Sequence, residues 1–518
     1  MGEEARSGRL PVIDAREVLS RIEEGYPVIY DHVAIAGDLD AGKIDLPLVH
    51  FERPAGEEQT ASVVVSLIQI RNCELLGNVN FDHLLFKQCL DMCGCVFFQE
   101  ARFKGATFSA GAKFEDCQFH RYATFKDAHF AQCARFQGTE FSAIANFGSC
   151  VFSCPVHFGQ CHFSELCTNF GESRILEDAD FTEARFSGTA NFRLSSFGKS
   201  ASFWKAEFLA GGIFQGVTFS GYASFQSTEM AGGADFRGAV FHEELNFEFA
   251  RLPGSAIFLG ACMKGQANFF RAEINDANFT GAVFLAGILF SQASTDRALF
   301  SGCQFQGGLD LSGAKIHTLR LQDASVSGWI NLHNTEFLRL EARWASMSRH
   351  LAYDGAAYLA LVKNFRNLEW FEDADDCYYH YRRASQSARR FLVQSDGRRG
   401  INWSKLSDCL AWISCGYGVR PGHTVFLSGM IVVVFALLYW TGGGIVVEPL
   451  NGSAPSISSQ GDLGFLDNLY FSAMVFTAKT QVKWYPAGIY RYVATVESVL
   501  GWLLLALFLV SLGRTMIR

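Results

Sequence analysis

The stretch ARFKGATFSAGAKFEDCQFHRYATFKDAHFAQCARFQGTEF, residues 101–141, decides the fold of most of this chain. A phenylalanine returns every eleven residues from Phe103 to Phe136, and a second series beginning at Phe108 follows five residues behind the first. Neither the period of a helix face nor that of a strand returns an apolar side chain at this spacing. An eleven-residue helical repeat would need more apolar positions and fewer Gly, Ser, Thr, Asp and Cys residues. The spacing therefore predicts a solenoid of short coils with large and small side chains pointing inward.

The repeat extends well beyond this stretch. With one residue inserted before Phe170, the large residues continue to Phe269, and weaker units precede and follow the clear ones. We therefore place the solenoid at residues 62–345, after an N-terminal cap at residues 1–61 that contains a short helix at residues 14–25. With about 22 residues in a coil and ~4.8 Å between coils, the rod is expected to be about 60 Å long.

The units ARFKG (residues 101–105) and ATFKD (residues 123–127) resemble those of pentapeptide-repeat proteins. This resemblance implies a right-handed quadrilateral β-helix. The family repeats strictly every five residues, whereas this chain alternates five and six, so an extra residue is expected at two corners of each coil. Some pentapeptide-repeat proteins resemble DNA and bind topoisomerases through an acidic face. The repeats of this chain are only weakly acidic, so we expect a scaffold and no mimicry of DNA. The net charge of −8 gives the chain no basic field for nucleic acid, so no nucleic-acid partner is expected.

The fifteen cysteines are irregularly spaced and often stand where other coils have small residues. This placement predicts small buried side chains in a reducing compartment, with no disulfides and no metal site. The sequence shows no phosphate-binding loop, metal-ligand constellation or nucleophile elbow. We therefore predict no catalytic residue, no cofactor and no enzyme activity. The charged N-terminus is not expected to act as a signal peptide.

Residues 346–422 form a helical, basic linker. Between Cys377 and Arg420 there are eight basic residues and two acidic ones. Such a run is often a solvated face, but this one directly precedes an apolar segment, which favours a role at a membrane surface. Within the linker, an interfacial helix is expected at residues 401–415, with one apolar side that carries Trp403, Leu406, Leu410, Trp412 and Ile413. Membrane lipids are therefore predicted partners.

Two apolar segments in residues 423–518 predict membrane-spanning helices at residues 424–440 and 493–512. The second segment carries one charge, Glu497. Basic residues precede the first segment and follow the second, so both chain termini are expected in the cytoplasm and the protein is expected in the cell (inner) membrane as a multi-pass protein. Between the two segments, the apolar residues 466–477 are too short to span, which indicates a re-entrant helix.

This order of segments resembles the pore module of the two-transmembrane potassium-channel superfamily. The residues that carry the resemblance are LYFSAMVFT (residues 469–477) as pore helix, the stretch that follows it, and then WYP (residues 484–486) before the second apolar segment. The resemblance implies a homotetramer, a selectivity filter and an inner-helix hinge near Gly501. Laid on this sequence without gaps, the family filter Thr-Val-Gly-Tyr-Gly-Asp falls on residues 478–483.

The filter departs strongly from that family. Thr480 and Val482 stand at its two glycine positions, where a positive φ is needed for carbonyls to face the ion. A potassium-selective filter is therefore not expected. Lys479 would repel cations, which favours permeation by anions or a wide, poorly selective pore. The predicted filter and pore residues are Thr477, Ala478, Lys479, Thr480, Gln481 and Val482.

Glu497 and Trp484 are predicted to support the pore, with Glu497 paired to Lys479, Lys483 or Arg491 or acting as an anchor for the loop. The filter-like string Gly416-Tyr417-Gly418 precedes the first span and is interpreted as a turn. Two functions remain open. The first is an ion channel whose permeant ion is unknown, built from a tetrameric pore-loop module and a cytoplasmic β-helix. The alternative is a non-conducting, membrane-anchored β-helix scaffold or sensor that recruits a cytoplasmic partner.

Overall fold

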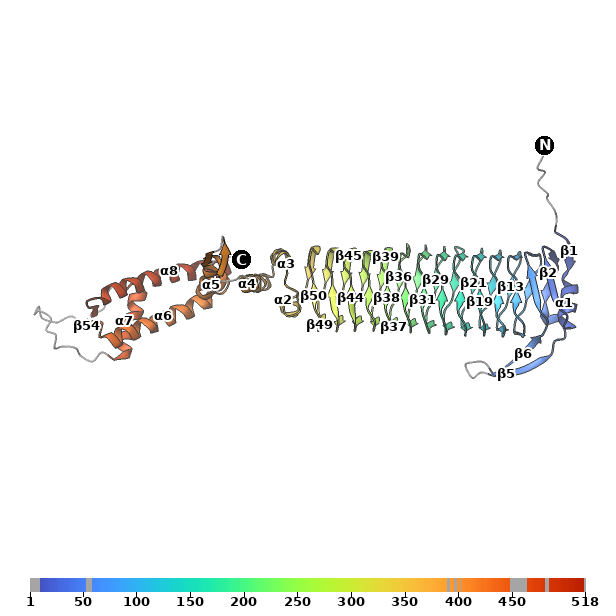
Figure 1. Ribbon diagram of the computed structural model, residues 1–518, viewed down its shortest axis with the longest axis horizontal. Helices are drawn as coiled ribbons and strands as arrows, with labels where there is room; N and C mark the ends of the chain where they lie inside the picture. The colour runs from blue at the N-terminus through green and yellow to red at the C-terminus, as the bar shows by residue number, and fades with distance from the viewer. Residues whose placement is uncertain are drawn as a thin grey trace, which may run out of the picture. The chain divides into compact units, whose positions relative to one another are not determined.

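The computed structural model describes residues 10–52, 58–388, 392–395, 398–401, 403–447, 464–479 and 484–516. It divides into two compact units, Met1–Asp354 and Gly355–Arg518. The first unit is a parallel β-solenoid of about 15 turns, the pentapeptide-repeat β-helix that the sequence predicts (Figure 1). The second unit is helical and contains two long apolar helices.

Four sheets form the sides of the β-helix, three of 14 strands and one of nine. Most strands are only two residues long, and neighbours within a sheet come from successive turns. For example, β13 (Ala101–Arg102) pairs in parallel with β17 (Ala123–Thr124), so that Ala101 lies opposite Ala123. Fourteen stacked strands at ~4.8 Å give a length of about 62 Å, in agreement with the rod length predicted from the repeat.

The phenylalanine series forms the core of the β-helix. Phe103 and Phe125, one turn apart, stack with ring centroids 4.8 Å apart and planes 1° from parallel. Phe114, which follows β15 (Ala112–Lys113) on the opposite side of the coil, meets Phe103 edge to face at 5.2 Å. Offset stacking along the rod and edge contacts across it are both favourable ring geometries. All three rings are fully buried, which explains why the repeat returns Phe at these positions.

The small residues two places earlier also point inward, and several close hydrogen bonds to the preceding turn. Cys117 Sγ donates to the Met92 carbonyl at 2.9 Å, and Ser195 Oγ donates to the Phe170 carbonyl at 2.7 Å. All fifteen cysteines are free, and nine of them are buried. The prediction of small buried side chains is confirmed at Cys117, where the thiol also satisfies a backbone acceptor.

The N-terminal helix is confirmed. Helix α1 (Ala15–Glu23) begins at Asp14, whose side chain accepts a hydrogen bond from the Arg16 amide, and Gly25 with φ of 77° follows it. The next residues build the first turn through β2 (Val28–Asp31), β3 (Ala34–Ala36) and β4 (Leu39–Asp40), which pair with the turn that follows. An antiparallel hairpin of β5 (Leu48–Glu52) and β6 (Glu58–Val64), which the sequence does not predict, follows them.

The expected 22-residue coil holds only for the first part of the rod. From β39 (Arg251–Ile257) onward one strand per turn spans two sides. The spacing between turns changes from 22 residues at Leu252 to 21 residues at Ser255 and stays at 21, so that Ser294 lies opposite Lys315. The nine-stranded sheet ends at β32 (Glu207–Phe208), and beyond it the same side continues through single parallel bridges from Glu207 to Glu229 and from Glu229 to Arg251. The long strands are β39 (Arg251–Ile257), β42 (Glu273–Asn278), β45 (Ser294–Leu299), β48 (Lys315–Arg320) and β51 (Glu336–Glu341).

Ion pairs link successive turns on the outside of the rod. Arg320 Nε donates to Glu341 Oε2 at 2.7 Å, and this hydrogen bond holds the pKa of Glu341 below its usual value. Arg71 likewise donates to Asp91 from the turn before it. Several outward charges are therefore paired with a charge of the neighbouring turn, and such exposed pairs contribute little stability each.

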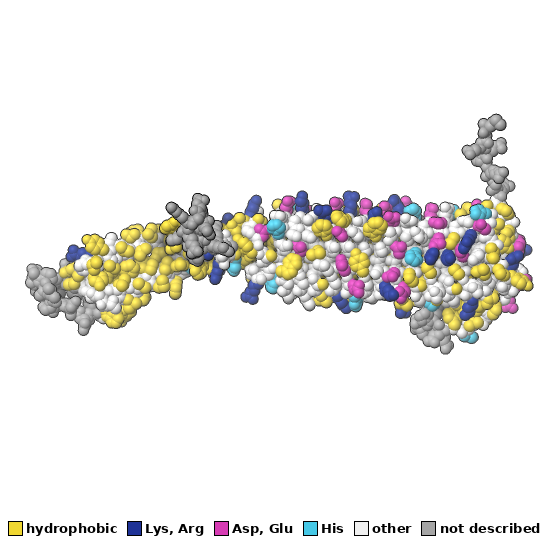
Figure 2. Space-filling model, in the orientation of Figure 1, with side chains coloured by type: hydrophobic (Ala, Val, Ile, Leu, Met, Phe, Trp, Pro, Cys, Tyr) yellow, Lys and Arg dark blue, Asp and Glu magenta, His cyan; other side chains and the backbone are white. Residues whose placement is uncertain are grey.

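The second unit begins with two helices that pack against each other and ends with an apolar bundle, whose surface Figure 2 shows as mostly hydrophobic. The two long apolar helices are α6, with 22 residues, and α8, with 27. Both are long and apolar enough to cross a membrane. They contain the predicted spans 424–440 and 493–512. The helices are α3 (Gly355–Asn367), α4 (Phe371–Ala388), α5 (Trp403–Cys415), α6 (Pro421–Gly442), α7 (Phe465–Phe476) and α8 (Tyr490–Met516).

Candidate functional site

The short helix α7 packs against both long helices, and the chain around it leaves and returns at one end of the bundle. After α6, strand β54 (Ile445–Val447) pairs antiparallel with β55 (Trp484–Pro486), which directly precedes α8. The sequence gives no signal for this two-stranded sheet. It joins the Gly442 end of α6 to the Tyr490 end of α8, and α7 lies between the two strands in the chain.

Helix α7 ends halfway along its neighbours. A Cβ atom at Gly501 of α8 would lie 2.1 Å from the Phe476 carbonyl oxygen, and Ser472 Oγ lies 2.9 Å from the Val432 carbonyl oxygen of α6. Gly501 and Val432 each lie about 15–17 Å from the end that β54 and β55 join, at 1.5 Å per residue. The C-terminal end of α7 therefore reaches the middle of the bundle, where the predicted filter begins.

Glu497 joins the three helices. Its side chain is fully buried, and Oε2 accepts a hydrogen bond from the Tyr439 hydroxyl of α6 at 2.7 Å. Its other oxygen, Oε1, lies within hydrogen-bond distance of the Ser472 hydroxyl of α7. Ser472 has one proton, so it donates either to Glu497 or to the Val432 carbonyl at a given moment. One carboxylate on α8 thus connects both of the helices that it packs against.

Neither described basic candidate is the partner of Glu497. Among the described residues, Tyr439 and Ser472 fill its two oxygens, while Lys479 is exposed and Arg491 Nε donates to the Pro486 carbonyl at 3.4 Å. The structure supports the interpretation of Glu497 as an anchor, because hydroxyl groups can reach a buried carboxylate without bringing a second charge. The sequence could have pointed to Ser472, because it carries the one hydroxyl within the apolar run FSAMVF (residues 471–476). It gave no signal for Tyr439, which resembles an ordinary tyrosine at a membrane interface.

The predicted filter is described only in part. Thr477, Ala478 and Lys479 are all exposed at the C-terminal end of α7, and residues 480–483, which include Thr480, Gln481 and Val482, lie outside the described residues. Ala478 has φ of 54°, and the Lys479 amide donates to the Met474 carbonyl at 3.0 Å. This is the left-handed helix end that glycine usually makes, so the backbone is strained at Ala478.

Lys479 stands out because of its position. No ion-pair partner of Lys479 is found within the part of the chain that the structure describes, and the side chain is exposed. It directly follows the helix end that lies beside Gly501. The carbonyl groups at a helix C-terminus carry partial negative charge, which favours a lysine there. A cation is therefore present at mid-length of two apolar helices.

Trp484 of β55 packs against α7 and against a buried cluster of the bundle. Its ring centroid is 5.9 Å from that of Tyr470 on α7, at 89° between the planes, and it packs against a buried cluster that includes Tyr439 and Phe471. Gly501 lies within the continuous helix α8. Its described role is close packing against the α7 backbone, and the hinge that the resemblance implies stays a prediction.

The linker helix α5 is present, with one difference from its predicted apolar side. Trp403, Leu410 and Ile413 are exposed along it, but Trp412 turns inward and its Nε1 donates to the Tyr379 hydroxyl at 2.9 Å. Trp412 is two residues from Leu410, which places it about 200° around the helix. The string Gly416–Gly418 is confirmed as a turn, with positive φ at all three residues, between α5 and α6.

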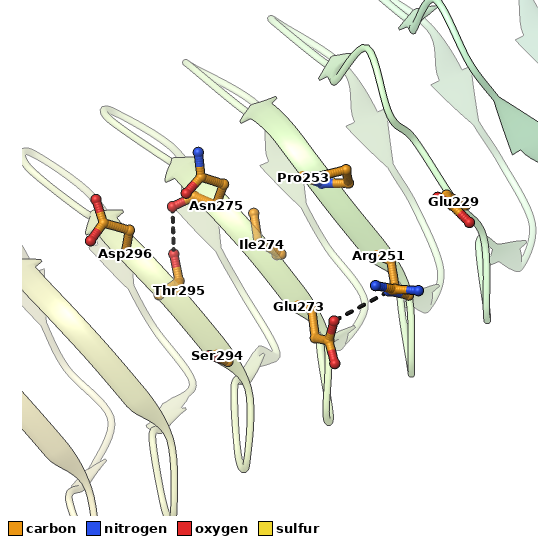
Figure 3. Close-up of a pocket in the computed structure, with 9 residues that line it drawn as sticks. All are labelled: Glu229, Arg251, Pro253, Glu273, Ile274, Asn275, Ser294, Thr295 and Asp296. Carbon is orange, nitrogen blue, oxygen red and sulfur yellow. Dashed lines mark hydrogen bonds and ion pairs between the residues drawn. The ribbon is translucent and has the colours of Figure 1, made fainter.

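A shallow groove on the β-helix is a weaker candidate. It lies over the long strands β39, β42 and β45, and Figure 3 shows Arg251, Glu273, Thr295 and Asp296 among the residues that line it. Arg251 Nε donates to Glu273 Oε2 at 3.2 Å, so the guanidinium group of the groove is already paired with a carboxylate of the same groove. Among the described residues, no group of three His, Cys, Asp or Glu side chains is placed to hold a metal ion.

Comparison with known proteins supports the repeat unit. A family model for pentapeptide repeats (9 copies) matches residues 70–128, 114–162, 209–251 and 225–273. No curated protein and no solved structure matches the chain. The chain therefore contains a pentapeptide-repeat β-helix, and helices follow it, two of which are long and apolar.

Proposed function

We propose that this protein is the subunit of a homotetrameric membrane pore, in which α6 and α8 span the bilayer and α7 is a re-entrant pore helix. The observation that supports this most directly is Lys479. The described residues offer Lys479 no ion-pair partner, and a lysine in the middle of a hydrocarbon layer costs about 2.5–3.5 kcal/mol on insertion scales. That cost is avoided when the lysine faces a water-filled path between copies of the chain. Two spanning helices cannot enclose such a path, so several copies are required.

The proposed pore favours anions or selects poorly. A ring of four Lys479 side chains at the C-terminal end of α7 would repel cations. Positions 480 and 482 lack glycine, so the backbone does not have the conformational freedom that a potassium filter uses. Arg420 and Arg514 lie at the same end of the two long helices, which favours placing that end in the cytoplasm. The free cysteines of the β-helix suit the same reducing compartment.

Conductance measurements on the purified full-length chain test the proposal. In planar bilayers with a KCl gradient, the wild-type reversal potential is expected near zero or toward the chloride equilibrium potential. Lys479→Glu is expected to move it toward the potassium potential, and Lys479→Ala is expected to give an intermediate value. Lys363→Ala on the exposed face of α3 removes a charge elsewhere in the same unit and is expected to leave the reversal potential unchanged.

The oligomeric state provides a second test. Four chains of 57.3 kDa give a protein mass of about 230 kDa in detergent. A monomer would contradict the pore. A tetramer without conductance under any tested condition would also contradict it and would leave the alternative, a membrane-anchored β-helix scaffold.

A further inference from the structure

Helix α4 contacts the last turn of α8 through one aspartate and one tyrosine. Arg514 Nη2 lies 4.0 Å from Asp375 Oδ1, and its guanidinium carbon lies 5.6 Å from the centre of the Tyr378 ring. Asp375 and Tyr378 are three residues apart and therefore share one face of α4. The guanidinium thus has a carboxylate and an aromatic ring as partners on the same helix.

The neighbouring positions of α4 hold the start of α6 in the same way. Arg420, the residue before Pro421, donates from Nη2 to Asp376 Oδ1 at 3.2 Å. Its guanidinium carbon lies 4.0 Å from the centre of the Tyr379 ring, and this tyrosine is buried. Two consecutive Asp–Tyr pairs on one helix therefore bind the two arginines at one end of the apolar bundle.

Helix α4 is also attached to α5 and the turn after it by separate contacts. Arg382 Nη2 donates to Asp408 Oδ1 at 2.6 Å, and the Tyr417 hydroxyl donates to Gln386 Oε1 at 2.8 Å. The Trp412 indole donates to the Tyr379 hydroxyl. These contacts hold α4 in place even when the two arginines are released. Loss of the arginine contacts should therefore free the ends of α6 and α8 without unfolding α4.

We propose that α4 is a latch that holds the Pro421 end of α6 and the Met516 end of α8 together, and that its release lets these ends separate and opens the pore. The proposal rests on the proposed pore function. At their other ends the same helices are fixed by Glu497 and by the β54–β55 pair, so movement is concentrated at the latched end. Both aspartate–arginine pairs are partly exposed, with 39% and 41% of the arginine side chains accessible, and exposed pairs are weak enough to release.

The position of α4 in the chain supports this role. The helical pair α3–α4 begins at Gly355, directly after the unit of repeats ends at Asp354. A force or a binding event on the repeats that is passed along the chain therefore reaches α4 before it reaches α6 or α8. The latch gives the repeat unit a route to the pore that needs no direct contact between the β-helix and the membrane helices.

Hydrogen exchange on the full-length protein in lipid nanodiscs tests the latch without requiring conductance. Asp375→Asn combined with Asp376→Asn should raise exchange in the last turns of α8 and the first turn of α6 by about fivefold for each lost pair. Glu372→Gln removes an exposed acid from the same helix and should leave exchange unchanged. Asp375→Arg combined with Arg514→Asp should restore protection at the end of α8.

Exchange and conductance together separate the two proposals. If the double asparagine variant keeps wild-type protection, or the charge swap restores nothing, the latch is wrong. If the protein conducts, the double variant should raise the open probability about tenfold or more without changing the reversal potential. An unchanged open probability in a conducting protein would overturn the latch. Absence of conductance in every variant would instead overturn the pore, and exchange would still decide whether α4 holds the helix ends.

Discussion

Replacing Glu497 tests how the helical bundle is held together. In Glu497→Ala the buried Tyr439 hydroxyl loses its acceptor, whereas Ser472 can still donate to the Val432 carbonyl at 2.9 Å. One orphaned hydroxyl costs about 1–2 kcal/mol, because hydrogen bonds in membrane bundles are weaker than their environment suggests. The lost packing contacts of the Cγ methylene and the carboxyl group add about 1–2 kcal/mol. We therefore expect a loss of about 2–4 kcal/mol in the free energy of unfolding.

Titration of the purified full chain with SDS in mild detergent measures this loss. Far-ultraviolet circular dichroism at 222 nm reports mainly on the second unit, because nearly all of the described helix lies there. Tyr439→Phe removes only the hydroxyl and should cost about 1 kcal/mol, and Glu497→Gln, which keeps the shape and one acceptor, should cost less than Glu497→Ala. Val496→Ala, an exposed neighbour on α8, serves as the control. A Glu497→Ala midpoint equal to that of Val496→Ala would refute the anchor.

Three further outcomes are expected. Gly501→Ala should displace α7 and lower the free energy of unfolding of the bundle by more than about 1 kcal/mol, because the added Cβ would collide with the backbone of Phe476. Gly429→Ala in α6 is the matched control: its Cβ would meet nothing within 4 Å, so it should be neutral or stabilising in the same titration. In the folded protein a maleimide should label the exposed Cys167 but not Cys154, because burial raises the pKa of the Cys154 thiol to about 12; rapid labelling of Cys154 would contradict this packing. The thermal stability of the β-helix should fall as pH drops below about 4.5, because the unfolded chain then takes up a proton at Glu341 that the folded state, with its lower pKa, still resists. Glu341→Gln should weaken this dependence, and an unaltered pH profile would argue against it.

The sign of the last prediction follows from the direction of the pKa shift. The pKa of Glu341 is lower in the folded state than its ordinary value of 4.5, because Arg320 donates to the carboxylate. The folded state therefore binds this proton less readily than the unfolded state does. The stabilising contribution is complete above the ordinary pKa and disappears as the pH falls through the folded one.

The sequence determined the β-helix almost completely. Each turn repeats the environment of the turn below it, so one short stretch such as residues 101–141 carries the information for the whole rod. The Phe spacing predicted the stacked core, and the Asp14 cap predicted α1. The change to 21-residue turns between Leu252 and Ser255 was also present in the spacing, but the sequence alone does not show which corner has lost the residue, and strand pairing does.

The sequence also indicated the lengths and order of the helices in the second unit, because apolar length and flanking charge are local properties. It did not determine their contacts. The β54–β55 pair, the bond of Glu497 with Tyr439 and the contact of Gly501 with α7 join residues far apart in the chain.

The latch arginines show the same limit. Sequence reasoning treated the basic residues of the linker as a surface for lipid, whereas Arg420 lies on Asp376 and Tyr379 of α4. A basic side chain binds whichever carboxylate or ring the fold brings near it, and a charge count contains no distances. Periodic packing can be read from a sequence because its neighbours recur at a fixed spacing, but a contact made once between distant segments is decided only by the tertiary structure.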